Sequence, residues 1–212
     1  MFRYKKGFTL AEVLITLLIT GIVASIVIPN IIQDTQQAEF HTAWKKEYAI
    51  ISQATLRIMN DNGGTIEGVF GNSDKMMNTY LSYLNPVKIC PYGQIYGNCW
   101  HKNDGSSKVL TGIGITTWES TSAAIMNDSS FMLFTPSDCN ITSTWAYIPI
   151  CGKIIVDVNG FKGPNTIGKD MYGLYIFKNS IKPIGGANDR FQPDACRPDR
   201  HGWGCAAVYL YQ

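Results

Sequence analysis

Apolar residues are unevenly distributed along this chain, and the longest apolar run lies near its beginning. Residues 8–32 read FTLAEVLITLLITGIVASIVIPNII, and Glu12 is the only charged residue among them. About 20 apolar residues form a helix long enough to cross the roughly 30 Å hydrocarbon core of a bilayer. The pattern therefore predicts a transmembrane helix over residues 8–32.

Charged residues on either side of this segment predict its orientation. Residues 1–7 contain three basic residues and no acidic one, whereas Asp34 and Glu39 follow the segment. Basic residues favour the cytoplasmic side of a membrane. We therefore expect a single-pass protein of the cytoplasmic (inner) membrane, with its N-terminus in the cytoplasm and the rest of the chain outside.

Two simpler interpretations of the segment fit less well. A secretory signal has an apolar core of only about 7–15 residues before its cleavage site, which is shorter than this run. A plain membrane anchor explains the apolar residues but not Glu12, because a carboxylate at the bilayer centre costs up to about 3 kcal/mol and less near the interface. Ionisable residues within membrane segments are candidates for a functional role.

Beyond Pro29 the composition becomes more polar, but the helical period continues. Apolar residues recur at intervals of three, four and seven, which predicts an amphipathic helix over residues 33–62. The predicted apolar stripe consists of Ala43, Trp44, Tyr48, Ile51 and Ile58. The charged residues expected off the stripe are Lys45, Lys46, Glu47 and Arg57. Asn62-Gly63-Gly64 is a typical helix end, so one helix of about 80 Å would run from residue 8 to residue 62, with a kink tolerated at Pro29.

Residues 63–212 are expected to form a globular head. The pattern predicts a short helix over 74–84 and strands over 131–134, 153–158, 174–178 and 207–211, with a loop over 183–198. Helices first and strands later, with little helix between the strands, favour an α+β fold with an antiparallel sheet.

Composition excludes some function classes. The net charge is +2 and no basic block occurs, so the sequence gives no reason to expect a nucleic-acid partner. No common catalytic motif is present, such as G-x-S-x-G, H-E-x-x-H or a P-loop. His41, His101 and His201 are far apart in sequence. We therefore do not expect an enzyme.

The start of the chain matches a specific pattern. Residues 6–14, KGFTLAEVL, place a glycine after a basic leader, then Phe8, and a glutamate at the fifth position after the glycine. This stretch resembles the processing site of type IV prepilins and type II secretion pseudopilins, although Ala11 stands where a larger aliphatic residue is common. Pro29 resembles the kink proline of their helices.

The resemblance implies how these residues act. A prepilin peptidase would cleave the leader, residues 1–7, between Gly7 and Phe8, and would methylate the new amine of Phe8. Glu12 would pair with a Phe8 ammonium and set the register between subunits. A Glu12 that extends to the membrane interface is the alternative.

The resemblance also implies a pilin-like fold and a structural function. The chain would be a subunit of a type IV pilus or a type II secretion pseudopilus, whose partners are other pilin or pseudopilin subunits and an inner-membrane assembly platform. The filament would lie in the periplasm or on the cell surface. Alternatives are a membrane-tethered periplasmic enzyme or binding protein, and a minor tip subunit that binds a surface or a secreted substrate.

All six cysteines lie in the head, where an exported location favours disulfides. Six cysteines allow 15 connectivities, but their grouping favours the local pairs Cys90–Cys99, Cys139–Cys151 and Cys196–Cys205. The last loop loosely resembles the C-terminal disulfide loop of many pilins. Zinc is a weaker alternative, because no C-x₂-C occurs and histidine is scarce.

A glycine-rich segment over 157–170 has two interpretations, and it resembles loops in the heads of pilin-like proteins. Asp157, Asn159, Asn165 and Asp170 offer the hard oxygen atoms that calcium prefers. The segment does not match an EF-hand, and two carboxylates are few for tight calcium binding. The simpler interpretation is an Asn-Gly turn with aspartates that cap backbone N–H groups. We therefore predict no obligatory cofactor, with calcium as the alternative.

Overall fold

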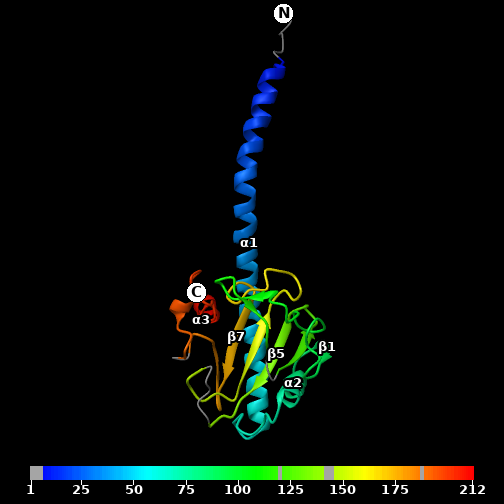
Figure 1. The fold of residues 1–212 in the computed structure, drawn as a ribbon, viewed down its shortest axis with the longest axis vertical. Helices are drawn as coiled ribbons and strands as arrows, with labels where there is room; N and C mark the ends of the chain where they lie inside the picture. Colours follow the sequence, from blue (N-terminus) through cyan, green and yellow to red (C-terminus); the bar gives the residue numbers. More distant parts are fainter. Residues whose placement is uncertain (1–6, 119–120, 141–145, 187–188) are drawn as a thin grey trace, which may run out of the picture. The chain divides into compact units, whose positions relative to one another are not determined.

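The computed structural model describes residues 7–118, 121–140, 146–186 and 189–212, and the side chain of Asn30 is not described. The chain divides into two compact units, Met1–Glu39 and Phe40–Gln212, and the second unit is the head together with the rear part of the long helix. Helix α1 (Leu10–Asp61) runs through both units (Figure 1).

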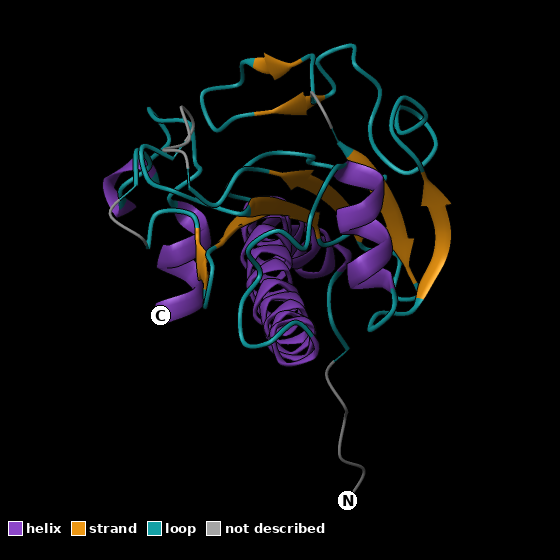
Figure 2. Cartoon of the chain, turned by 90° about the horizontal axis from the view of Figure 1, so that it is seen from below, coloured by secondary structure: helices purple, strands orange, loops and turns teal. Residues whose placement is uncertain are grey.

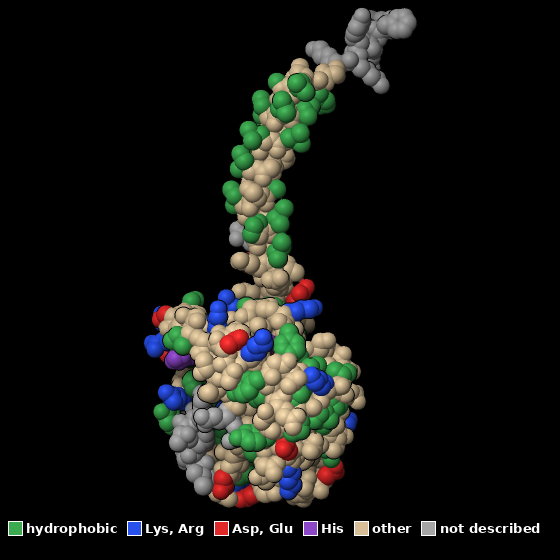
Figure 3. Space-filling model, turned by 45° about the vertical axis from the view of Figure 1, so that its right-hand side comes forward, with side chains coloured by type: hydrophobic (Ala, Val, Ile, Leu, Met, Phe, Trp, Pro, Cys, Tyr) green, Lys and Arg blue, Asp and Glu red, His purple; other side chains and the backbone are tan. Residues whose placement is uncertain are grey.

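The front part of α1 exposes its apolar side chains on all sides. The large apolar residues between Leu10 and Ile32 are 43–79% exposed. Figure 3 shows hydrophobic side chains along this part of the helix, whereas charged side chains gather on the head. A helix that is apolar all round requires a lipid or protein environment, and this helix is long and apolar enough to cross a membrane.

The rear part of α1 is amphipathic, as the sequence predicts, with one exception. Trp44, Ile51 and Ile58 are fully buried against the head, and Tyr48 is half-buried. Glu47 is the exception: it was expected on the polar side and is only 3% exposed. It lies three residues after Trp44 and four before Ile51, so its spacing places it on the buried face despite its charge.

Two glycines end α1 as expected. The helix stops at Asp61, and the N–H of Gly64 donates to the carbonyl of Met59 at 2.7 Å. Gly63 and Gly64 both have positive φ angles, 73° and 90°, a conformation that glycine adopts at no steric cost.

The head contains a six-stranded sheet in the order β1-β4-β5-β6-β7-β8, with every neighbouring pair antiparallel. Its strands are β1 (Pro86–Cys90), β4 (Ser122–Met126), β5 (Phe131–Pro136), β6 (Gly152–Asp157), β7 (Met171–Ile176) and β8 (Ile181–Pro183). A separate hairpin pairs β2 (Ser107–Lys108) with β3 (Gly114–Ile115). The remaining elements are α2 (Ser73–Leu81), the 3₁₀ helix η1 (Pro193–Ala195) and α3 (Cys205–Tyr211). The fold is therefore α+β with an antiparallel sheet.

Both faces of this sheet are covered. Phe134, Ile154 and Leu174 face a core shared with α1, α2 and α3, whereas Leu133 and Ile155 face a second core beneath the loops. Figure 2 shows the β2–β3 hairpin and long loops beyond the sheet, on the side away from α1. Because both faces are buried, the strands are nearly continuous apolar runs, and every residue of β7 is buried.

One predicted strand was wrong. Residues 207–211 belong to helix α3, which begins at Cys205. A short apolar run does not distinguish a strand from a buried helix. Here tertiary contacts favour the helix: the indole N–H of Trp44 donates to the carbonyl of Ala206 at 2.9 Å, and Tyr209 stacks on His41.

Several other boundaries differ from the sequence-based predictions. Helix α2 ends at Leu81, three residues before the expected end at 84, and the N–H of Tyr83 donates to the carbonyl of Tyr80 in a tighter turn. Strand β7 begins at Met171 and ends before residues 177–178. The expected loop over 183–198 contains η1 and the last residue of β8. The sequence analysis missed β1, β2, β3, β4 and β8, which are short or contain small and charged residues.

Candidate functional site: the N-terminal motif

Thr9 and Glu12 form a reciprocal cap at the start of α1. The backbone N–H and the hydroxyl of Thr9 both donate to Glu12 Oε2 at 2.8 Å, and the backbone N–H of Glu12 donates to Thr9 Oγ1 at 3.3 Å. This T-x-x-E arrangement is a capping box, which satisfies N–H groups at the first turn of a helix. The sequence analysis missed this role, although the Thr9-Leu10-Ala11-Glu12 spacing signals it.

The motif is exposed in the single chain. Phe8 is 89% exposed and Leu10 is 79% exposed. Polar groups farther along the front helix bond internally: the hydroxyls of Thr16, Thr20 and Ser25 donate to backbone carbonyls three or four residues earlier. These internal hydrogen bonds make the segment compatible with lipid, where an unsatisfied polar group is costly.

Pro29 lies inside α1, and the helix continues through it. Proline has no N–H, so the carbonyl of Ser25 receives no helical hydrogen bond from position 29. Such a missing bond allows a bend, and a kink at Pro29 stays a prediction.

Comparison with protein families identifies the motif. A family model described as the prokaryotic N-terminal methylation motif matches residues 2–28. The chain carries the prepilin-type cleavage and methylation signature. The search of curated proteins and the search of solved structures gave no match. The signature supports a type IV pilin-like or pseudopilin-like precursor, a class that is usually structural rather than enzymatic.

The cysteines of the head form three disulfides. The pairs are Cys90–Cys99, Cys139–Cys151 and Cys196–Cys205, the local pairs that their grouping favours. Each closes a loop of 9 or 12 residues. Cys205 is also the first residue of α3, so its disulfide holds that helix to the preceding loop.

The aspartate carboxylates of the segment over 157–170 accept hydrogen bonds from backbone N–H groups. Asp170 accepts from the backbone N–H of Asn165 at 2.8 Å and from that of Thr166 at 2.7 Å. Asp157 accepts from the backbone N–H of Asn159 at 3.1 Å. Both aspartates therefore cap backbone groups, as the simpler of the two interpretations expects.

His101 joins this segment, which sequence spacing did not show. Its Nε2 lies 2.8 Å from Asp157 Oδ2, and both side chains are buried. Burial raises the pKa of Asp157 to about 7, against the lowering effect of the hydrogen bond from His101. His41 instead packs on Tyr209, and His201 lines a cavity on the other side of the sheet from α1.

The calcium interpretation has one observation in its favour and one against it. The side-chain oxygens of Asn159 and Asn165 are buried and have no hydrogen-bond partner among the described residues. Within that part of the chain, however, no three His, Cys, Asp or Glu side chains converge as metal ligands. Calcium binding by Asp157, Asn159, Asn165 and Asp170 therefore stays a prediction that needs its own test.

Proposed function

We propose that this protein is a structural subunit of a type IV pilus or a type II secretion pseudopilus. The observation that carries the proposal is the methylation signature at residues 2–28, followed by a helix that exposes apolar side chains on all sides. A filament in which such helices pack together would bury that surface, and so would a membrane before assembly.

In this proposal the N-terminal residues have successive roles. A prepilin peptidase cleaves between Gly7 and Phe8 and methylates the amine of Phe8. Cleavage removes the three basic residues of the leader, which favour cytoplasmic retention. The helix can then leave the inner membrane for the assembly platform, and the head lies in the periplasm or on the cell surface.

Glu12 is the residue proposed to set the register between subunits. Its carboxylate lies four residues from the new amine of Phe8, and an ion pair in an apolar environment is favourable only at the correct axial position. In the single chain Thr9 satisfies this carboxylate. Assembly would add a Phe8 ammonium, its own or that of a neighbouring subunit, to the same group.

We propose a structural role rather than an enzymatic one. The class that carries this signature is usually non-enzymatic. His101, the most buried histidine, contacts a carboxylate and the rings of Trp100, Phe131 and Phe161. This aromatic environment suits packing better than proton transfer to a substrate.

Substitutions at Glu12 test the assembly role. Filaments are sheared from cells that express only Glu12→Ala or Glu12→Gln, and their yield is compared with that of the unaltered chain. We expect both variants to insert and to be cleaved, but to give at least about tenfold fewer filaments, because the Phe8 ammonium loses its partner. Glu39→Gln, which neutralises an exposed glutamate farther along the same helix, should assemble normally.

Thr9→Val separates the two roles of Glu12. This variant removes the hydroxyl of the capping box but keeps the carboxylate, at a cost to the helix start of about 0.5–2 kcal/mol. If pairing with Phe8 matters, Thr9→Val should retain most filaments. Normal yields from Glu12→Gln would contradict the charge-pairing role, and equal losses in Glu12→Gln and Thr9→Val would assign the defect to helix capping.

A further inference from the structure

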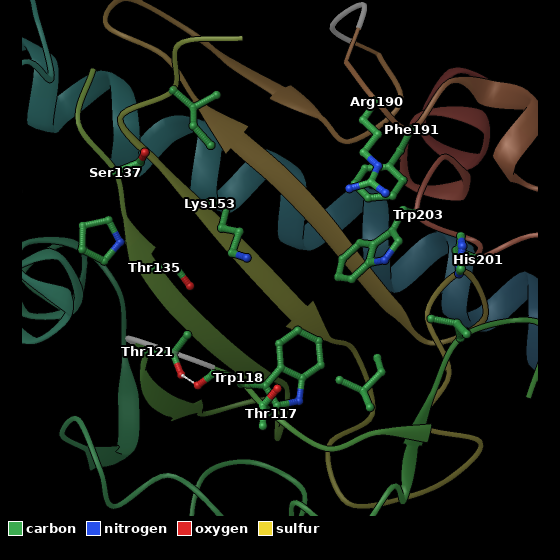
Figure 4. A pocket seen from close by; sticks show the side chains of 14 residues that line it. Thr117, Trp118, Thr121, Thr135, Ser137, Lys153, Arg190, Phe191, His201 and Trp203 are labelled. Carbon is green, nitrogen blue, oxygen red and sulfur yellow. Dashed lines mark hydrogen bonds between the residues drawn. The ribbon is translucent and has the colours of Figure 1, made fainter. Parts of the chain in front are cut away.

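A cavity of about 620 Å³ opens on the sheet face that points away from α1. Its floor is the end of β5 and the start of β6, and its walls come from the loops around Trp118, Arg190 and Trp203. Figure 4 shows these side chains around one open space, with Lys153 projecting from the sheet into it. Ligand pockets typically have volumes of about 300–1,000 Å³, so this cavity could hold one or two sugar rings.

The cavity is electropositive along its described lining. Lys153 and Arg190 contribute basic groups, and the described lining residues include no Asp or Glu. Burial lowers the pKa of Lys153 to about 8. A negatively charged ligand group in the cavity would favour the charged form of this lysine, so the site gains most from an anion.

Aromatic rings form part of the wall, and Phe191 and Trp203 lie on the same side as Arg190. Trp118 and Trp203 meet edge to face, with ring centroids 6.3 Å apart and an interplanar angle of 72°. Phe191 packs on Trp203 at 5.9 Å. Aromatic residues with polar groups at their edges are typical of sites that bind a partly apolar, partly hydroxylated surface. Trp118, Phe191 and Trp203 leave only 6–9% of their surface exposed. They therefore offer the C–H groups of a sugar a small apolar contact rather than a whole ring face, which a small inorganic anion would not use.

Two hydroxyl groups lie beside Lys153 in the sheet. Thr135, Lys153 and Tyr175 are register partners in a row across β5, β6 and β7. Thr135 Oγ1 and Tyr175 Oη are both buried, and neither has a hydrogen-bond partner among the described residues. Thr135 lines the cavity itself. Leaving a buried hydroxyl unsatisfied costs about 1–3 kcal/mol. Tyr175 is not among the residues that line the cavity, so a ligand oxygen would recover this cost at Thr135 alone.

The geometry points to a binding site for an acidic sugar, a uronic acid or a short uronic oligosaccharide, in this cavity of the head. The carboxylate of the ligand lies between Lys153 and Arg190. Its ring packs against Trp118 and Trp203, and its hydroxyls reach Thr135 and Thr121. This role is independent of filament assembly, because every residue of the site belongs to the head.

Acidic peptides are the main competing ligand. They would use the same cations, but they offer neither the C–H groups of a sugar ring for two tryptophans nor several ring hydroxyls for the threonines and Ser137. A lipid tail would need a longer apolar channel than this partly polar cavity. The balance of cations, aromatic rings and hydroxyls therefore favours the sugar.

The test measures binding to the full chain by isothermal titration calorimetry. The protein is kept in a polyoxyethylene detergent, which has no sugar headgroup. The probes are digalacturonate, its dimethyl ester and tri-aspartate. The ester retains the rings but loses both charges, and tri-aspartate retains acidic groups but has no ring. We expect digalacturonate to bind at least about tenfold more tightly than either of the other two.

Matched variants locate the binding to this cavity. Arg190→Gln should weaken digalacturonate binding at least about fivefold. Arg197→Gln removes an arginine of the same head that pairs with Asp199 at the surface, outside the cavity, and should leave binding within twofold. Lys153→Met serves as a second variant, and its fold is checked by circular dichroism, because this side chain is largely buried.

Several results would overturn the proposal. These are no digalacturonate binding to the unaltered chain, equal binding of the dimethyl ester or of tri-aspartate, and undiminished binding by Arg190→Gln. Each outcome is measured on unassembled protein, so none of them depends on whether the chain forms filaments.

Discussion

Glu47 is a buried carboxyl group, and its replacement should change how the free energy of unfolding depends on pH. Burial, together with the nearby side chain of Asp128, raises the pKa of Glu47 to about 8 against the lowering effect of the Lys46 ammonium. Lys46 contacts Asp128 and lies 3.6 Å from Glu47. Burial would also raise the pKa of Asp128, but hydrogen bonds with Glu47, Lys46 and Ser130 hold it below its usual value. Glu47 is therefore the protonated partner of this carboxyl pair at neutral pH.

The sign of the effect follows from the two pKa values of Glu47. In the unfolded chain the group titrates near 4.5, and in the folded chain near 8. Its contribution to stability is complete below pH 4.5 and is lost as the pH rises to 8. One pKa unit corresponds to 1.36 kcal/mol, so this difference sets an upper limit of about 4–5 kcal/mol. We expect about half of this limit, because Lys46 beside the pair is exposed to water.

Glu47→Gln removes this titration and keeps the shape of the side chain. The measurement is urea unfolding of the full chain in nonionic detergent, followed by tryptophan fluorescence at pH 4.5, 6, 7 and 8. Urea is uncharged and does not screen the pair. Glu47→Gln should match the unaltered chain at pH 4.5 and exceed its free energy of unfolding by about 2 kcal/mol at pH 8.

Glu39→Gln is the control, because Glu39 is exposed on the same helix. Its stability should follow that of the unaltered chain at every pH. If the Glu47→Gln and unaltered curves stay parallel from pH 4.5 to pH 8, Glu47 is ionised in the folded head and the reasoning about its burial is refuted.

Three further predictions concern the head. Replacing Cys196 and Cys205 together by serine should lower the free energy of unfolding by about 2.5–3 kcal/mol, because the open loop gains entropy in the unfolded chain; urea unfolding of the double variant measures this, and an unchanged midpoint would contradict it. Trp44→Phe should lower it by about 1–2 kcal/mol through loss of the hydrogen bond to Ala206, whereas a neutral effect would show that this bond contributes nothing net. Backbone N–H groups already donate to the carboxylate of Asp170, so 1 mM calcium should leave the thermal unfolding temperature unchanged relative to a chelator. A rise of several degrees with calcium that is abolished by Asp170→Asn would instead establish the calcium site.

The sequence predicts the long helix well because its signals are local. The apolar period, the N-terminal motif and the Asn62-Gly63-Gly64 end each depend on residues close together in the chain. The disulfide pairs also follow from short spacing. Two further local signals were missed. The T-x-x-E pattern of Thr9 and Glu12 indicates a capping box, and the spacing of Glu47 from Trp44 and Ile51 places it on the buried face despite its charge.

Features that depend on distant contacts were not predictable in this way. Residues 207–211 form a helix because they pack against Trp44 and His41 on α1. The contact between His101 and Asp157 joins residues 56 positions apart. The cavity brings Trp118, Lys153 and Trp203 together from three separate segments. No periodicity or motif in the sequence encodes these long-range contacts, because they depend on the strand order of the sheet.

The most direct test of the proposed function is the mass and N-terminal sequence of the chain extracted from membranes. In cells with an active prepilin peptidase, we expect the chain to begin at N-methylated Phe8. In cells without the peptidase, and for Gly7→Val in cells that have it, the chain should begin at Met1 and stay in the membrane. If the unaltered chain retains its leader in the presence of the peptidase, or has the same N-terminus with and without it, this protein is not processed as a prepilin.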